Sequence, residues 1–135
     1  MTKIIALVFA AALISTVPAF AQQASAPLAS APIKRIPLQK SDVPGTNMEA
    51  ITGIAEIAPN VNIGRHSHFG TETGYVLEGE TTLLIDGQPP KIMKAGDSYT
   101  IPAGAIHDAK SGATPVRIIA TYIVEKGKPL ATPAQ

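Results

Sequence analysis

The chain consists of short β-favouring runs separated by turn residues. From Ile33 onward, branched and aromatic residues gather in runs that are bounded by Gly, Pro, Asp and Asn. No window after the first 21 residues shows a sustained helical period with capping residues. The pattern therefore predicts an all-β antiparallel sandwich or barrel. Its predicted strands are 51–58, 75–78, 81–86, 92–94, 99–101 and 116–124.

The first 21 residues have the three parts of a secretory signal peptide. Lys3 precedes a small and apolar run at 4–17, and Ala19-Phe20-Ala21 forms a cleavage site. The alternative is an uncleaved membrane anchor, but the run is shorter than the ~20 residues that span a bilayer. We therefore expect cleavage after Ala21 and a periplasmic or secreted protein.

The mature chain is expected to form one domain. Removing 21 of the 135 residues leaves 114, which is an ordinary size for a single domain. Residues 22–32 are rich in Gln, Ala, Ser and Pro, and they predict a flexible tether. The domain itself is expected at 33–124, followed by an irregular C-terminal tail at 125–135.

The predicted mature chain carries no excess charge. Lys3 is the only charged residue among 1–21, so 11 Lys and Arg residues become 10 and balance the 10 Asp and Glu residues. This balance argues against nucleic acid and against an anionic membrane surface as partners of the mature chain. Since the chain has no cysteine, the fold depends on its core and on any metal that it binds.

All three histidines lie in a pattern typical of a metal site. His66 and His68 point to the same face of a strand, about 7 Å apart along the chain. Phe69-Gly70-Thr71 gives the chain room to turn before Glu72, and His107 follows 35 residues after Glu72. Imidazole and carboxylate are standard ligands of divalent first-row metals. The pattern predicts one divalent ion, and ligand type does not choose among Mn, Fe, Co, Ni, Cu and Zn.

These residues resemble the two motifs of the cupin superfamily. The first motif has the pattern Gly-x5-His-x-His-x3–4-Glu-x6-Gly. At its named positions this chain has Asn60, His66, His68, Glu72 and Gly79. The second motif has the pattern Gly-x5-Pro-x-Gly-x2-His-x3-Asn. At its named positions this chain has Gly96, Pro102, Gly104, His107 and Ser111. Asn60 departs from the leading Gly but tolerates the left-handed backbone conformation. Ser111 replaces a turn residue on which no ligand depends.

The resemblance covers 33–124 and is to small single-domain bacterial cupins of the cupin 2 type. It implies a double-stranded β-helix, which is a jelly-roll barrel, with an ion near its open mouth. The ligands it implies are His66, His68, Glu72 and His107. Cupins include dioxygenases, decarboxylases, isomerases, lyases, sugar-binding modules and storage proteins, so the fold leaves the reaction open.

Two classes of function stay open. The first is a metal-dependent enzyme, a dioxygenase or an isomerase/lyase, acting on a small oxygen-rich metabolite through the centre of three histidines and one glutamate. The second is a non-catalytic small-molecule-binding protein whose metal is structural or anchors the ligand. Phe69 is the only Phe after Ala21, and Trp is absent. This composition argues against an aromatic platform for polysaccharide and favours a small molecule.

No catalytic acid or base is identified by the sequence. The candidates are Glu72, if it leaves the metal, and Tyr75, Tyr99, Tyr122 and Glu56. Tyr75 lies at an odd offset from Glu72 along the strand, so we expect it to face away from the ligands. Tyr99 and Tyr122 are likewise interpreted first as core or interface residues.

Three residues next to the candidate ligands are expected to lie at the surface, in the pocket wall or in the core. Arg65 and Asp108 each flank a histidine by one position, so both are expected to point out of the barrel as surface charges. Phe69, at the turn between ligands, fits either a wall of the pocket or the core.

The run at 116–124 is apolar on both faces. Ile118, Ala120 and Tyr122 share one face, and Ile119, Thr121 and Ile123 share the other. Since only one face can look into the barrel, the second is expected to pack against 33–43 or against a partner subunit. Cupins commonly use the latter arrangement, so we expect a homodimer.

Overall fold

The computed structural model describes residues 32–135. The predicted signal peptide at 1–21 lies outside the described residues, as does the predicted tether at 22–32 except for Pro32. Within the described part of the chain, no helix is long and apolar enough to cross a membrane.

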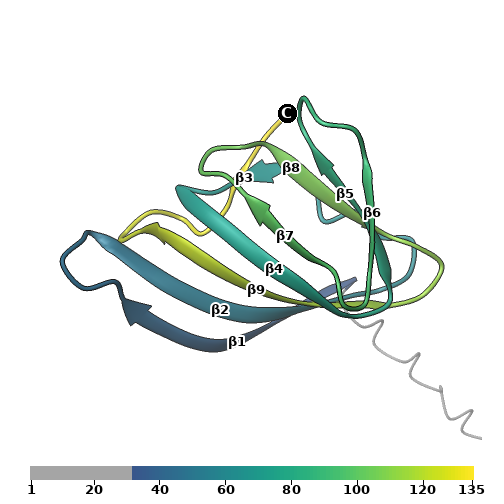
Figure 1. Ribbon diagram of the computed structural model, residues 1–135, viewed down its shortest axis with the longest axis horizontal. Helices are drawn as coiled ribbons and strands as arrows, with labels where there is room; N and C mark the ends of the chain where they lie inside the picture. Colours follow the sequence, from purple (N-terminus) through teal and green to yellow (C-terminus); the bar gives the residue numbers. More distant parts are fainter. Residues whose placement is uncertain (1–31) are drawn as a thin grey trace, which may run out of the picture.

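Ten strands form two five-stranded antiparallel sheets (Figure 1). In spatial order, the first sheet contains β1 (Ile33–Asp42), β2 (Met48–Ile57), β9 (Val116–Glu125), β4 (Gly70–Glu78) and β7 (Ser98–Ile101). The second contains β10 (Thr132–Pro133), β3 (His66–Ser67), β8 (His107–Ser111), β5 (Glu80–Ile85) and β6 (Lys91–Lys94). Residues 32–135 include no helix, which confirms the predicted all-β class.

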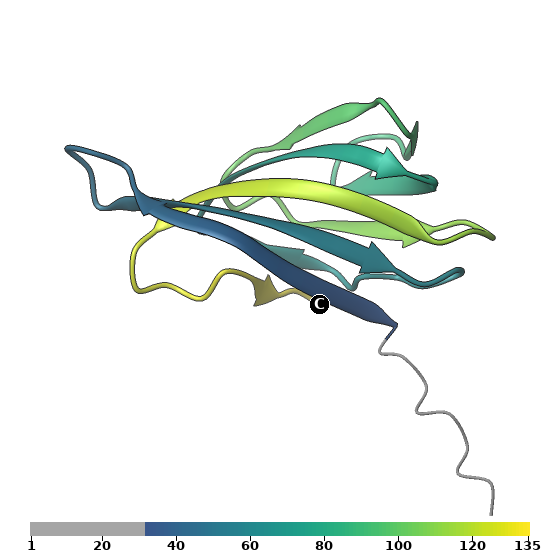
Figure 2. The same ribbon diagram turned by 90° about the horizontal axis from the view of Figure 1, so that it is seen from below.

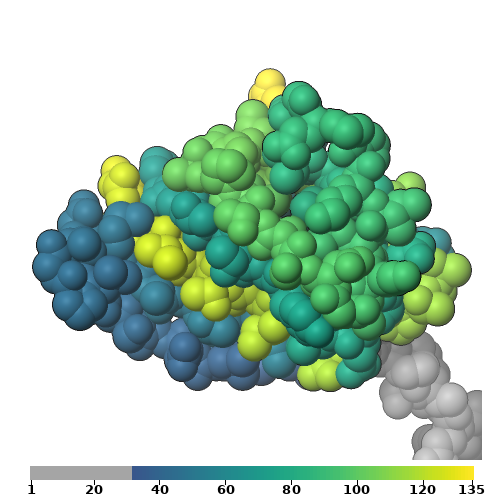
Figure 3. Space-filling view, in the orientation of Figure 1, coloured from purple at the N-terminus to yellow at the C-terminus, as the bar shows by residue number. Residues whose placement is uncertain are grey.

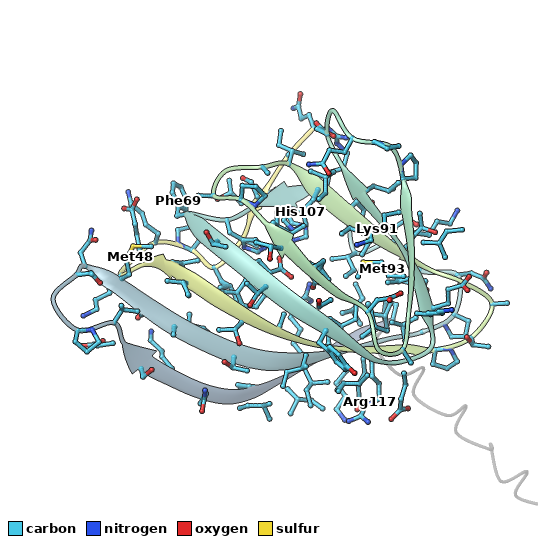
Figure 4. The ribbon with its side chains drawn as sticks, viewed as in Figure 1. Met48, Phe69, Lys91, Met93, His107 and Arg117 are labelled. Atoms are coloured by element: carbon cyan, nitrogen blue, oxygen red, sulfur yellow. The ribbon has the colours of Figure 1, made fainter. Side chains whose placement is uncertain are left out.

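The apolar core lies between the two sheets. Strand β9 buries alternate residues, Val116, Ile118 and Ala120, because successive side chains of a strand point to opposite faces. Met93 on β6 is fully buried and lies between the sheets in Figure 4. The core cluster comprises Ile57, Val76, Leu83, Met93, Ile101, Val116 and Ile118. Two facing antiparallel sheets with one core are consistent with the predicted jelly roll.

Strand β1 was not among the predicted strands. Its sequence, Ile33–Asp42, includes Lys, Arg, Gln and Pro, and most of its residues are exposed at the edge of the sheet. It pairs with β2 along its length, with an irregularity between Pro37 and Gln39. Proline, which cannot donate a backbone hydrogen bond, is tolerated at edges and bulges. Pairing with an apolar neighbour, rather than its own pattern, makes this segment a strand.

The C-terminal tail is mostly irregular, as expected, but it contains β10. Thr132 pairs with Ser67 and Pro133 pairs with His66, and the Ala134 N–H donates to the Arg65 carbonyl at 3.0 Å. Figure 2 shows the tail crossing from the end of β9 on the side where β1 lies. The tail therefore joins the sheet that carries two of the histidines.

Both positions that depart from the cupin motifs are accommodated. Asn60 has a φ of 58°, the left-handed conformation expected of it. The buried Ser111 hydroxyl donates to the Ala58 carbonyl at 2.6 Å and accepts from the Val61 N–H at 2.9 Å. These bonds attach the segment between β2 and β3 to β8.

Candidate metal centre

The two sheets bring all four predicted ligands together. His66 on β3 pairs with His107 at the start of β8, His68 follows β3, and Glu72 lies on β4 of the opposite sheet. Figure 4 shows His107 directed between the sheets. One donor atom from each of the four residues lies within 4.8 Å of the others. Donors bound 2.0–2.2 Å from one ion lie up to about 4.4 Å apart, so a small adjustment completes the site.

Three of the four side chains are buried. His68, Glu72 and His107 are 4%, 5% and 5% exposed, whereas His66 is half-buried. A molecule from solvent therefore approaches the group on the His66 side.

Backbone carbonyls orient the three imidazole rings. The Nδ1 atoms of His66 and His107 donate to the carbonyls of Gly64 at 2.7 Å and Ala105 at 2.9 Å, and Nδ1 of His68 donates to the Leu130 carbonyl. A carbonyl only accepts, so the proton of each neutral ring lies on Nδ1 and the lone pair on Nε2. Hydrogen bonds of this kind fix the orientation of metal-binding histidines.

The Nε2 atom of His68 shows that these residues fit a metal ion. It is buried without a hydrogen-bond donor among residues 32–135, and it faces the Glu72 Oε2 atom at 3.0 Å. Nε2 of His107 lies 3.2 Å from the same oxygen. Two buried acceptors at this distance repel each other unless a proton or a metal cation lies between them. The donor set, three imidazoles and one carboxylate, suits a divalent transition metal, and the ligand assignment stays a prediction.

Tyr99 positions the carboxylate of Glu72. Its hydroxyl donates to Glu72 Oε1 at 2.7 Å, which leaves Oε2 directed at the histidines. Burial raises the pKa of Glu72, but His107 and His68, when a proton lies on their Nε2 atoms, and the Tyr99 hydroxyl outweigh it and lower the pKa to about 2. Burial and the neighbouring Glu72 raise the pKa of Tyr99. Glu72 is therefore charged, and Tyr99 is a neutral donor.

Two of the histidines have shifted pKa values in the metal-free chain. Burial lowers the pKa of His66, and this outweighs the hydrogen bond to Gly64 that raises it. Burial also lowers the pKa of His107, but its hydrogen bonds to Glu72 and Ala105 outweigh burial and raise the pKa above the ordinary value of 6.5. A proton on His107 thus competes with a metal ion for Glu72.

The stabilisation by metal is expected to grow with pH. A raised pKa means that protonated His107 stabilises the metal-free fold below pH 6.5, and that this contribution disappears as pH rises through the raised value. Metal binding needs the neutral ring, so the metal-dependent increase in Tm should be larger at about pH 8 than at about pH 5. Thermal melts with and without added metal measure it. An equal increase at both pH values would contradict the competition.

The other acid–base candidates divide into two pairs. Tyr99 and Tyr122 reach the site, and the Tyr122 ring lies 4.8 Å from that of His68, between centroids. Tyr75 is 45% exposed on the outer face of β4, as expected. Glu56 pairs with Lys34 and Arg117 on that same outer face. Tyr75 and Glu56 therefore take no part in the site.

The predictions for the flanking residues are only partly right. Arg65 is an exposed charge and pairs with Asp86. Asp108 was expected on the surface but is 7% exposed, because its carboxylate accepts hydrogen bonds from the Gly64 and Ala109 amides. Phe69 is 40% exposed, beside Lys128, and belongs to neither the core nor the wall of the cavity below the ligands.

The sequence analysis missed the role of the C-terminal tail. Leu130 lies 62 residues from His68, and its carbonyl holds that ring. A backbone carbonyl has no signature in the amino-acid pattern, so no motif identifies it. The other two acceptors, Gly64 and Ala105, lie two residues before their histidines, and this local offset is readable from the sequence.

Removal of residues 129–135 is expected to weaken divalent-metal binding by about tenfold. The truncation removes the acceptor for His68 Nδ1, and outer partners of this kind typically contribute 10–100-fold to affinity. Removal of 134–135 alone is the control, because it retains Leu130. Competition titration against a chelating dye measures both affinities. Equal losses in the two truncations would show that Leu130 has no special role.

Comparison with known proteins identifies the fold. The family model of the cupin domain, Cupin_2, matches residues 53–127, which is more than half of the chain. No curated protein matches this sequence. A solved cupin superfamily protein from Desulfitobacterium hafniense is 18% identical with a TM-score of 0.59, and the match covers 69% of this chain and 78% of that one.

Two solved enzymes are also similar in fold. The polyketide cyclase RemF from Streptomyces resistomycificus is 23% identical with a TM-score of 0.61, covering 77% of this chain and 72% of the cyclase. The DMSP lyase DddQ from Ruegeria pomeroyi is 19% identical with a TM-score of 0.59, covering 63% of this chain. The match spans only 43% of that lyase. At these identities the likeness shows a shared fold and carries no activity across. The family match, the two facing sheets and the clustered motif residues together establish that this chain belongs to the cupin family.

Proposed function

We propose that the protein is an exported metal-dependent enzyme, a dioxygenase or an isomerase/lyase, acting on a small oxygen-rich metabolite. The observation that carries the proposal is the buried Nε2 atom of His68 facing the Glu72 carboxylate without a donor. A divalent ion bound there would supply Lewis-acid polarisation of an oxygen ligand. The lyase and the cyclase among the similar structures are consistent with this class of function.

The charge of the site favours anionic oxygen ligands. Glu72 contributes the single negative charge among the four ligands, so a divalent ion leaves a net charge of about +1. Enolates, hydroxy-ketones and small carboxylates are attracted to such a site. Tyr99 keeps Glu72 in place by holding its second oxygen.

The space around the site limits where a substrate binds. The cavity below the ligands has a volume of about 40 Å³ and is lined mainly by apolar residues, among them Leu83, Met93 and Ile118. A single water needs roughly 10–15 Å³, so this cavity admits only a few water-sized molecules. A metabolite therefore binds on the half-buried His66 side.

A second candidate is a non-catalytic binding protein whose metal is structural or anchors a ligand. The state of the two tyrosines at the site favours this alternative. Burial and Glu72 raise the pKa values of both Tyr99 and Tyr122, so neither is a ready base. Glu72 is then the remaining base candidate, and it is also a proposed ligand.

Metal analysis and a substrate panel distinguish the two candidates. Protein purified without an affinity tag is analysed for metal and then incubated with small enols and hydroxy acids. Turnover with oxygen consumption indicates a dioxygenase, and turnover without oxygen indicates an isomerase or lyase. Saturable binding without turnover supports the binding protein. Absence of metal from the protein, and failure to take up any of the six candidate metals, would overturn both.

Export and assembly are part of the proposal. Cleavage after Ala21 predicts that the protein recovered outside the cytoplasm begins at Gln22, which N-terminal mass spectrometry tests.

Strand β1 pairs with β2 at the sheet edge and leaves the outer face of β9 uncovered by 33–43. Ile123 is 40% exposed there, and Figure 3 shows β9 reaching the surface beside β2. This face supports a homodimer, and a monomer mass by light scattering would remove that support.

A further inference from the structure

A second hollow lies beside the metal centre, on its accessible side. It has a volume of about 260 Å³, and its wall includes His66, Arg35, Arg65, Ala131 and Pro133. A hollow of this size fits a small metabolite. Because His66 belongs to its wall, a molecule bound in this hollow lies next to one of the four proposed ligands.

The hollow carries positive charge that the protein does not neutralise. Arg65 is committed, since its two terminal nitrogens donate to Asp86 at 2.8 Å each. Arg35, on β1, makes no ion pair or side-chain hydrogen bond with any residue of 32–135. Among the described residues, no Asp or Glu lines the hollow.

Arg35 lies close to the ligand set on a second side as well. It lines a smaller hollow of about 130 Å³ together with Tyr122 and Leu130. The ring of Tyr122 packs on His68, and the Leu130 carbonyl holds the same histidine. Arg35 therefore lines two hollows, one bordered by His66 and the other by the two residues that contact His68.

Three of the residues that line the 260 Å³ hollow lie outside the matched cupin domain. The family model covers 53–127, whereas Arg35 precedes it and Ala131 and Pro133 follow it. Strand β1 and the tail thus lie outside the range that the family model matches. They supply a charged group beside a site whose ligands come from the shared motifs.

We propose that Arg35 binds the carboxylate of a small hydroxy or keto acid whose second oxygen reaches the metal. This inference rests on the proposed metal site and names the substrate class for it. A guanidinium offers two parallel N–H donors that match a carboxylate, and such pairs are strong and directional. The hollow, with the apolar Ala131 and Pro133 in its wall, has the volume for a short-chain acid.

Lactate and lactamide, which differ in the charged group alone, test the proposal on the metal-loaded protein. Calorimetric titration is expected to show that the wild type binds lactate more tightly than lactamide. Arg35→Gln should weaken lactate binding by about tenfold and leave lactamide binding and metal affinity within about twofold. Lys34→Gln is the matched control, since Lys34 lies on the same strand but pairs with Glu56 on the outer face, and it should behave as wild type.

The outcomes separate this inference from the proposed function. Failure to bind metal would overturn the proposed function itself. Metal binding combined with equal lactate affinity in wild type and Arg35→Gln would overturn the role of Arg35 alone. Absence of lactate binding by the metal-loaded wild type, or tighter binding of inorganic phosphate than of lactate, would overturn the assignment to a carboxylate.

Discussion

Replacing His68 or His107 by alanine is expected to weaken divalent-metal binding by about tenfold or more. Each substitution removes a buried Nε2 atom that faces the Glu72 carboxylate at 3.0 or 3.2 Å. Neither histidine has a neighbouring imidazole that could take its place, since the chain has three histidines and all belong to the cluster. Titration against a chelating dye, together with metal analysis, measures the loss. Unchanged metal binding in both variants would refute the ligand assignment.

A matched pair on β4 separates the ligand role of Glu72 from a general charge effect. Glu72→Gln removes the charge at the cluster, whereas Glu78→Gln removes the same charge from an exposed residue that pairs with Arg117. The first should weaken metal binding by about tenfold or more, and the second should leave it unchanged. Similar losses in the two variants would indicate only long-range electrostatics.

Replacing Gly70 by alanine is expected to lower the free energy of unfolding by about 2–3 kcal/mol. A Cβ atom at Gly70 would lie 1.9 Å from the Ile123 carbonyl oxygen and 2.7 Å from the Val124 Cα atom. Both are backbone atoms of the paired strand β9, so neither can move aside without separating the strands. Because Gly70 lies between His68 and Glu72, the same shift should also weaken metal binding. Chemical denaturation with and without metal measures both effects.

Gly112→Ala is the control for this substitution. The nearest atom to a Cβ at Gly112 is the Glu80 carbonyl oxygen at 3.8 Å, which is an ordinary contact. Its unfolding free energy should therefore stay within about 0.5 kcal/mol of wild type. A loss at Gly70 no larger than at Gly112 would show that β4 and β9 can separate at little cost.

The fold class and the clustered ligands could be predicted because both depend on local pattern. A strand period of two places His66 and His68 on one face, and the turn residues divide the chain into strands that can only pair antiparallel. The motif spacing then adds Glu72 and His107, which the structure brings within reach of the other two. Local spacing and the resemblance to the two cupin motifs are enough here, because each ligand acts through its own side chain.

Other features depend on contacts between segments far apart in the chain. The Leu130 carbonyl that orients His68, the amides that bury Asp108 and the β9 backbone that excludes any side chain at Gly70 are all backbone groups. Every residue has such groups, so composition and periodicity cannot single them out. Arg35 likewise comes beside His66 only because β1 pairs with β2 and the tail crosses to β3. The sequence by itself determined the all-β class and the set of candidate ligands. Only the tertiary structure decided what holds those ligands in place and which charge lies beside them, because both depend on long-range packing.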